Sequence, residues 1–489
     1  MSQVLDAASS DDEDGADGEE YSSGSYHSGD SEEFEMLHRE VLERTAVKRD
    51  IKDFLGGLPG QMGVTYQVVD RLGEGTFSSV YLGYDLQHDY HDNSYWIEPT
   101  PDDGEDRPRV KVALKKILAT SSPARIANEL AILEALRGCR NVSQLITAFR
   151  HLDQVIIVLP YHPSDDFRAF YKYMDAGHIQ VYMKSLLQAL KDIHQRGIVH
   201  RDVKPANFLF DYESCTGVLC DFGLAERYVP PRKATCQHAP ASLTSLHGKH
   251  QKTPESKVVE QAVYVARTRA KAGEARVGFL HEDKRGSVKT NRAGTRGFRA
   301  PEVLLKCPDQ TVGIDIWSAG IMLLSILTQK FPIFNSNDDI EALMEIAAIF
   351  GRSAIERCAM LHNRTMICNV PTLETNPDSM KNLILKLNPH IFTPPLTHPS
   401  SADARAHIEA MDQAIDLCTR LLRLDVTKRP TAAVALRHPF FEGLVDDEDL
   451  MVQEVLSGLD GRCGALHGID DTGRRKLLPG ESASRRAFS

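Results

Sequence analysis

A stretch near the middle of the chain concentrates side chains that could transfer a phosphoryl group. It reads His200-Arg-Asp202-Val-Lys204-Pro-Ala-Asn207, followed by Asp221-Phe-Gly223. The transfer needs a carboxylate that orients a hydroxyl and accepts its proton, a cation beside the phosphate, and oxygen ligands for Mg²⁺. We therefore predict catalytic roles for Asp202, Lys204 and Asn207. Asn207 and Asp221 are the predicted metal ligands; a polar loop that matches both motifs by chance is the alternative.

A glycine-rich turn lies upstream, between two stretches that read as strands. Its residues are Gly73-Glu-Gly75-Thr-Phe77-Ser-Ser-Val80. Without Cβ atoms, the backbone N–H groups of such a turn can approach phosphates closely. Alone this is a weak signal, because Gly-x-Gly is common, and Ser78 stands where a third glycine is usual.

A lysine ends the next predicted strand, Val112-Ala-Leu-Lys115. A strand would fix its ammonium near the α- and β-phosphates of a nucleotide, and Glu129 on the following helix is the expected counter-ion. Taken separately, Lys115 and Glu129 read as ordinary surface charges.

A third motif lies downstream and reads Gly294-Thr-Arg-Gly-Phe-Arg-Ala300-Pro-Glu302. We expect a structural pair between Glu302 and Arg429, because a buried carboxylate needs a cation. Asp315, at the start of a predicted central helix, is expected to hold the backbone around Asp202.

The elements that must position these residues follow from local patterns. Strands are predicted at 66–73, 79–83, 110–117, 145–149 and 155–159, and a helix begins at Ser122-Pro123 with a good N-cap. Helical periodicity dominates from about residue 165, notably at 179–195 and 314–327. Residues 370–402 are rich in Pro and Asn and are predicted to be irregular.

In this order the motifs resemble the eukaryotic protein-kinase superfamily over roughly residues 66–442. The resemblance implies an α+β, bilobal fold with a β-rich N-lobe, a helical C-lobe and long inserts. It also implies ATP and Mg²⁺ as cofactors, a hinge near Tyr161 and a gatekeeper at Leu159. The implied ATP-binding residues are Leu72, Gly73, Gly75, Val80, Ala113, Lys115, Glu129, Leu159 and Tyr161.

The resemblance extends to specificity, because Lys204 and Thr295 are typical of Ser/Thr rather than Tyr kinases. A pseudokinase scaffold would have lost Lys115, Asp202 or Asp221, and all three are present. The expected domains are an acidic disordered tail at 1–36, a lead-in helix at 37–65, an N-lobe at 66–162 with an insert at 85–109, a C-lobe at 163–442 with an insert at 227–291, and a tail at 443–489.

Composition points to a protein that works inside the cell. The net charge of −11 comes from the first 36 residues, which hold twelve acids and no Lys or Arg. Nine scattered cysteines without a CxxC pair indicate reduced thiols. The start of the chain does not resemble a signal peptide, and no apolar run approaches the ~20 residues of a membrane helix.

The wording of three motifs narrows the resemblance to the cell-division-cycle-seven kinases, the catalytic subunits of DDK complexes that trigger replication origins. These motifs are the glycine turn, the start of the helix at Ser122 and the run from Arg292 to Pro308. Between Gly223 and Ala300 lie 76 residues, and a long insertion there is a family trait. A cyclin-dependent-like or casein-type Ser/Thr kinase is the alternative.

This narrower resemblance implies a nuclear kinase that is inactive until a regulatory subunit of the dumbbell-former type binds. Its implied substrates are acidic or pre-phosphorylated tails of the minichromosome-maintenance helicase. The predicted substrate-binding residues are Arg292, Thr295, Arg296 and Arg299, since Arg pairs well with carboxylate or phosphate. Arg296 departs from the family pattern, which has Pro there, and some of these arginines could instead pair with the protein's own acids.

The insert at 227–291 has several possible roles. Part of it is expected to dock the regulatory subunit, because loops this long are usually functional or disordered. Cys236, His238, His247 and His250 could ligate zinc, against the plainer interpretation of a solvated loop. More bases than acids also permit DNA contact, but without interleaved aromatic residues we expect no direct DNA binding.

Overall fold

The computed structural model describes residues 44–56, 65–75, 77–88, 109–151, 153–229, 236–238, 250, 252–272, 292–366, 368, 370, 373–374, 377–394, 401–451, 467–469 and 475–477. The chain divides into two compact units, Met1–Gly57 and Leu58–Ser489. In the first unit the described part is a helix over residues 44–56. The predicted acidic tail and most of the insert at 85–109 lie outside the described residues.

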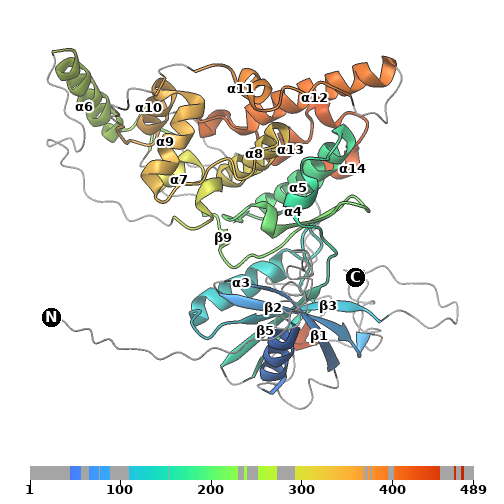
Figure 1. Cartoon of the computed structure of the whole chain (residues 1–489). Coiled ribbons are helices and arrows are strands. Elements are labelled where there is room, and N and C mark those ends of the chain that lie inside the picture. The colour runs from blue at the N-terminus through green and yellow to red at the C-terminus, as the bar shows by residue number, and fades with distance from the viewer. Residues whose placement is uncertain are drawn as a thin grey trace, which may run out of the picture. The chain divides into compact units, whose positions relative to one another are not determined.

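A five-stranded antiparallel sheet opens the second unit, in the order β1-β2-β3-β5-β4 (Figure 1). Its strands are β1 (Tyr66–Glu74), β2 (Ser78–Asp85), β3 (Lys111–Ile117), β4 (Thr147–His151) and β5 (Gln154–Pro160). The glycine turn joins β1 to β2. Val80 lies opposite Lys115, and Ala113 lies opposite Leu159. Directly opposed residues share a face, and so do residues two apart along a strand. All four side chains therefore lie on one face of the sheet.

Helix α3 (Pro123–Ala135) follows β3 and begins where the sequence predicts. The Ser122 side chain accepts a hydrogen bond from the Arg125 N–H, and Pro123 occupies the first turn. Glu129, Ile132 and Leu133 are its buried residues. Their spacing of three and four places them on one face, so the Glu129 carboxylate is directed into the protein rather than into solvent.

Helices dominate the rest of the second unit, as the periodicity predicts, and short strands flank the loop at 200–207 (Figure 1). All sixteen residues of α8 are buried, and α8 packs against α5, α11 and α12. The helices are α4 (Phe167–Phe170), α5 (Ala176–Gln195), α6 (Pro254–Lys271), α7 (Pro301–Leu304), α8 (Gly313–Thr328), α9 (Asp339–Phe350), α10 (Arg352–Leu361), α11 (Met380–Leu387), α12 (Ser401–Leu421), α13 (Ala432–Ala435) and α14 (Asp447–Leu450). The strands are β6 (Ile198–Val199), β7 (Phe208–Asp211), β8 (Thr216–Leu219), β9 (Glu226–Arg227), β10 (His467–Ile469) and β11 (Arg475–Leu477).

The irregular structure predicted at 370–402 is wrong over α11. Ser379 caps this helix by accepting from the Asn382 N–H, and Ile384 is buried. The surrounding Pro and Asn residues dominate the composition of the window and hide a short amphipathic helix. The insert at 227–291 likewise contains a helix, α6. No helix in the described part of the chain combines the length and apolarity needed to cross a membrane.

Candidate active site

One buried carboxylate on α8, that of Asp315, fixes the backbone at the start of the loop at 200–207. Asp315 accepts hydrogen bonds from the backbone N–H groups of His200 at 2.9 Å and Arg201 at 2.8 Å, and His194 Nε2 lies 2.9 Å away. Burial alone would raise the pKa of Asp315, but the His194 contact outweighs it and the pKa is lowered. An ionised Asp315 thus fixes the backbone that presents Asp202.

Asp202 lies at the centre of a hydrogen-bonded group. Lys204 Nζ is 2.9 Å from Asp202 Oδ2, and the N–H and hydroxyl of Thr295 donate to Oδ1 at 2.7 and 2.8 Å. Asn207 Nδ2 donates to the carbonyl and the carboxylate of Asp202 at 2.8 and 3.0 Å. Burial would raise the pKa of Asp202, but Lys204 and Thr295 lower it. The carboxylate is therefore ionised and oriented at neutral pH.

A second charged group joins the sheet, α3 and the segment that follows β8. Lys115 Nζ lies 2.8 Å from Glu129 Oε1 and 2.6 Å from Asp221 Oδ1. Burial would lower the pKa of Lys115, but the two carboxylates raise it. For Asp221 burial would raise the pKa, and Lys115 lowers it to about 2. The predicted pair of Lys115 and Glu129 is formed, with Asp221 as a third member.

Two further side chains of α3 hold the segment after Asp221, and sequence reasoning missed both. Arg125 Nε donates to the Gly223 carbonyl at 2.9 Å, and Asn128 Nδ2 donates to the Ala225 carbonyl at 2.9 Å. One signal was available: Arg125 lies four positions before Glu129 and three before Asn128, and residues at these spacings share a helix face.

A cavity of about 400 Å³ lies beneath the glycine turn and opens onto both charged groups. Its lining includes Gly75, Lys115, Asp202, Asn207 and Asp221. The predicted ATP-binding residues Val80, Ala113 and Leu159 are half-buried on the sheet face that carries Lys115. Tyr161 is half-buried and Leu72 is 43% exposed. Of the predicted ATP-binding residues, Gly75, Lys115 and Glu129 line the cavity, and these five residues are not among its lining.

The glycine turn closes through its backbone. The Gly75 N–H donates to the Ser78 carbonyl at 2.8 Å. Because Ser78 takes part through its main chain, this hydrogen bond forms although the residue is Ser and not the usual glycine. Phe77 lies under the Arg125 guanidinium, 3.7 Å from the ring centre. This cation–π contact ties the turn to α3.

The chain returns to the loop at 200–207 through a narrow gap at Gly294. Its φ is +99°, and a Cβ there would lie 2.2 Å from the Arg201 carbonyl oxygen. Only glycine fits both the dihedral angle and the space. Further along, Arg429 Nη1 and Nη2 donate to the two Glu302 carboxylate oxygens at 2.7 and 3.2 Å. The predicted contact between these side chains is present.

The three predicted substrate arginines pair with one of the protein's own acids, which is the alternative that the sequence left open, and the sequence did not identify that acid. Arg299 Nη1 lies 2.8 Å and Arg296 Nε 3.7 Å from Asp339 Oδ1, and Arg292 Nη1 bonds Oδ2. Asp339 is the first residue of α9, and its side chain is 15% exposed. Three guanidinium groups share one carboxylate, so the cluster keeps an excess of positive charge.

Comparison with known proteins agrees with this geometry. The family model for the protein kinase domain matches residues 104–246 and 277–441, more than half of the chain. Cell cycle serine/threonine-protein kinase hsk1 of Schizosaccharomyces pombe is 42% identical over 77% of this chain and 72% of its own length. Cell cycle protein kinase spo4 of the same organism is 40% identical over 77% and 85%. The mouse cell division cycle 7-related protein kinase is 27% identical over 83% and 95%.

The predicted α+β kinase fold and the Ser/Thr kinase activity are therefore confirmed. Use of ATP and a divalent metal is general among protein kinase domains. This chain belongs to the protein kinase family and, within it, to the Cdc7-type cell-cycle Ser/Thr kinases.

Proposed function

We propose that Asp202 is the residue that accepts the proton of the substrate Ser or Thr hydroxyl. The hydroxyl oxygen bonds to the γ-phosphorus of ATP, the bond from that phosphorus to the β-phosphate oxygen breaks, and ADP leaves. The proton passes to Asp202, while Lys204 stabilises the charge on the transferred group. The observation that carries this assignment is the ionised Asp202 carboxylate, held by Lys204, Thr295 and Asn207 at the wall of the cavity.

Asn207 and Asp221 suit Mg²⁺ in chemistry and position. Asn207 uses its Nδ2 for Asp202, which leaves its amide oxygen as the group that could bind a cation. Asp221 accepts a hydrogen bond from Lys115 Nζ at Oδ1, and its carboxyl group is ionised. Hard carboxylate and amide oxygens are the ligands that Mg²⁺ takes, and the ion would neutralise charge on the phosphates.

The direct test is phosphorylation of an acidic Ser peptide by the purified chain together with its co-purified partners. Asp202→Ala should remove activity, whereas folding measured by circular dichroism should not change. Retention of more than about 1% of kcat by Asp202→Ala would contradict its role as base, since general base catalysis contributes about 10²–10⁴-fold.

We also propose that the arginine cluster selects substrates with an acidic or phosphorylated residue next to the target. The excess of positive charge around Asp339 supports this, because guanidinium groups bind carboxylate and phosphate in bidentate fashion. Thr295 lies between this cluster and Asp202, and its contacts with Asp202 and Lys204 position the catalytic group.

The biological setting that we propose is the partner-activated complex of the Cdc7 type, in the nucleus. The regulatory subunit would be of the dumbbell-former type and the substrates acidic tails of the minichromosome-maintenance helicase. The names of the relatives, cell cycle and cell division control kinases, support a role in the division cycle. The length of the insert at 227–291 supports this segment as the place where the partner acts, because loops this long in a compact domain are usually functional.

Purification of the tagged chain with mass spectrometry of bound proteins tests this setting. A regulatory subunit that bears a zinc motif supports it, and a cyclin supports the alternative of a cyclin-dependent-like kinase. High activity of the chain alone would contradict dependence on a partner. A variant that lacks residues 239–249 and 273–290 should lose the partner if the insert docks it.

A further inference from the structure

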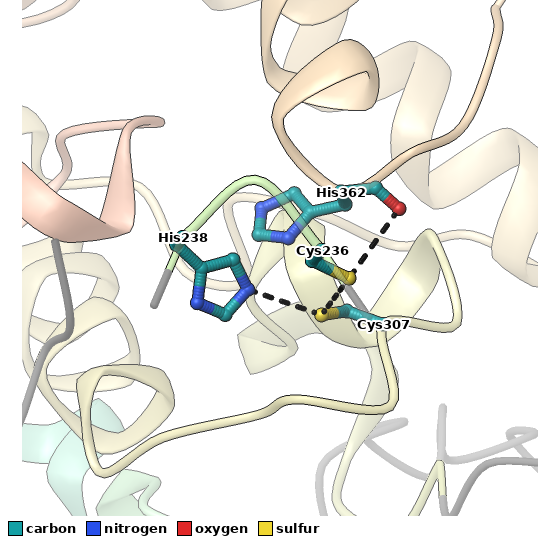
Figure 2. A group of neighbouring side chains, drawn as sticks. All are labelled: Cys236, His238, Cys307 and His362. Atoms are coloured by element: carbon teal, nitrogen blue, oxygen red, sulfur yellow. Dashed lines mark hydrogen bonds between the residues drawn. The ribbon is translucent and has the colours of Figure 1, made fainter. Parts of the chain in front are cut away.

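Four buried side chains meet in one cluster, and none of them is among the residues that line the cavity (Figure 2). Cys236 and His238 belong to the insert, Cys307 follows α7, and His362 follows α10. Each is at most 1% exposed. One potential ligand atom from each residue lies within 4.8 Å of the others. Three segments that are distant in sequence thus contribute two sulfur and two nitrogen donors to one point.

The histidines of this cluster lack the hydrogen bonds that buried imidazoles usually make. Among the described residues, neither ring nitrogen of His362 nor Nδ1 of His238 has a hydrogen-bond partner of regular geometry, and the group that the His362 side chain meets is the Cys236 thiol. The remaining nitrogen, His238 Nε2, lies 3.3 Å from Cys307 Sγ. Leaving a buried polar atom unpaired costs about 1–3 kcal/mol. A well-packed core histidine would not leave these atoms unsatisfied, whereas a metal ligand would use one of them.

The two sulfur atoms are also too far apart for a disulfide. Cys236 Sγ and Cys307 Sγ are 3.3 Å apart, whereas a disulfide bond measures about 2.05 Å. In a tetrahedral zinc site, Zn–S bonds of about 2.3 Å and Zn–N bonds of about 2.0 Å place two sulfurs about 3.8 Å apart and a sulfur and a nitrogen about 3.5 Å apart. The Sγ–Sγ distance of 3.3 Å and the distance of 3.3 Å from His238 Nε2 to Cys307 Sγ are within about half an ångström of those values. The four ligand atoms all lie within 4.8 Å of one another, so small shifts would bring them onto one ion.

We propose that Cys236, His238, Cys307 and His362 form a structural Zn²⁺ site. Binding would release one proton from each thiol, so two thiolates and Zn²⁺ give a centre without net charge, which suits a buried position. Soft sulfur ligands and imidazoles favour zinc over Mg²⁺ or Ca²⁺. The protein supplies all four ligands, which leaves no open position for chemistry.

The surroundings already hold the ligands in place. Asp309 Oδ2 accepts from the Cys236 N–H at 2.9 Å, which fixes the backbone beside this ligand. Gln237, between the two insert ligands, donates from its N–H to the Leu361 carbonyl at 3.0 Å and from Nε2 to the Met360 carbonyl at 2.9 Å. The zinc would complete a clamp between the insert and the end of α10.

The site has a consequence for the activation segment, the stretch from Asp221 to Glu302. Cys307 lies five residues beyond Glu302, the last residue of the activation segment. The metal would therefore join the first part of the insert to the residues that follow the activation segment. A second contact, Asn363 Nδ2 to Thr253 Oγ1 at 3.3 Å, anchors the start of α6 to the same loop. The insert is therefore fastened to the C-terminal helices at two points.

Two of the four residues that sequence spacing suggested as zinc ligands lie in this cluster. Cys236 and His238 belong to the cluster, but His250 is exposed and meets His238 only through a backbone bridge. His247 lies outside the described residues. Cys307 and His362 replace them, and no local spacing links these two residues to the insert. The structure thus changes the expected solvated loop into a buried site.

Zinc content of the full chain tests the proposal. Protein purified without added metal and dialysed should contain one zinc per chain by mass spectrometry, and Cys307→Ser and His362→Gln should each lower this stoichiometry at least fivefold. Cys418→Ser is the matched control, because Cys418 is equally buried but lies on α12, away from the cluster. A wild-type chain without zinc, or full zinc in Cys307→Ser, would overturn the site.

X-ray absorption at the zinc edge covers the case in which the variants fail to fold, since it needs only the wild-type protein. Two sulfur and two nitrogen ligands are expected. A shell of four sulfurs, or of oxygen and nitrogen alone, would place the metal elsewhere and contradict the proposal.

Discussion

Two clusters of charged side chains lie near the end of the activation segment, and they differ in the ratio of cations to anions. Glu302 and Arg429 form a one-to-one pair with exposures of 1% and 2%, and Arg429 also donates to the carbonyls of Gly313 and Arg423. Asp339 instead faces three arginines whose side chains are 17% to 45% exposed. The first cluster is closed and neutral, and the second is open and positively charged.

The difference separates a structural role from a binding role. A buried pair with every donor used has nothing left for a ligand, and its loss leaves an uncompensated charge in the interior. An open cluster with more cations than anions attracts an external anion, and its arginines are exposed to solvent when no anion is bound. The comparison predicts opposite effects of substitution on stability and on substrate use.

The largest effect is expected at Arg429. Arg429→Met leaves the buried Glu302 carboxylate without a cation, so the free energy of unfolding should fall by about 3–5 kcal/mol in urea denaturation. The matched control is Arg420→Met, which breaks an exposed pair with Asp416 and should cost less than about 0.5 kcal/mol. Equal losses in the two variants would contradict the structural role of the buried Glu302–Arg429 pair.

A smaller effect, on catalysis rather than folding, is expected at Arg299. Arg299→Ala should lower kcat/KM by about 10- to 100-fold for a peptide with phosphoserine next to the target, because a charge-assisted bond of about 1.5–3 kcal/mol is lost. Arg292→Ala should cost less, since its side chain is 45% exposed and better screened. The same peptide with Ala at that position is the control. Equal losses on both peptides would contradict selection of anions by the cluster.

The smallest expected effect is on the pH dependence of activity and concerns Asp202. Its carboxylate is buried like Glu302, but it faces the cavity. Its pKa is lowered from 3.8, so its ionised form contributes stability above about pH 4 that is lost as pH falls further. The wild-type enzyme should therefore show no acid limb from Asp202 between pH 5 and 7. Lys204→Met removes the main cause that lowers the pKa, and burial should then move the limb to higher pH. A profile of kcat/KM against pH measures it, and an unshifted limb in Lys204→Met would contradict this assignment.

The sequence predicts the part of the site that depends on short spacing. Asp202, Lys204 and Asn207 lie within one loop, and Asp221 follows through a short hairpin, so their meeting needs little beyond local structure. Glu129 follows from a helix whose N-cap is readable at Ser122. The long-range pair of Glu302 and Arg429 was expected because a buried carboxylate needs a cation.

The rest could not be predicted because it depends on tertiary contacts between common residue types. Asp339 begins a helix some forty residues beyond the arginines that it gathers, and nothing in the sequence marks it among the other acids. Cys307 and His362 are single residues that meet the insert only after α7 and α10 have packed. The disagreement at α11 has a different cause, since a short helix between prolines leaves little periodicity to detect.

The fit at Gly294 bears on how this protein could be engineered. On the other side of the insert, β9 pairs with β6 through Val199 and Glu226, so the chain is fixed in place both before it leaves for the insert and when it returns. Closing a longer loop between fixed ends costs only about 0.6 kcal/mol for each doubling of its length. A change in the length of the insert would therefore leave the geometry around Asp202 intact.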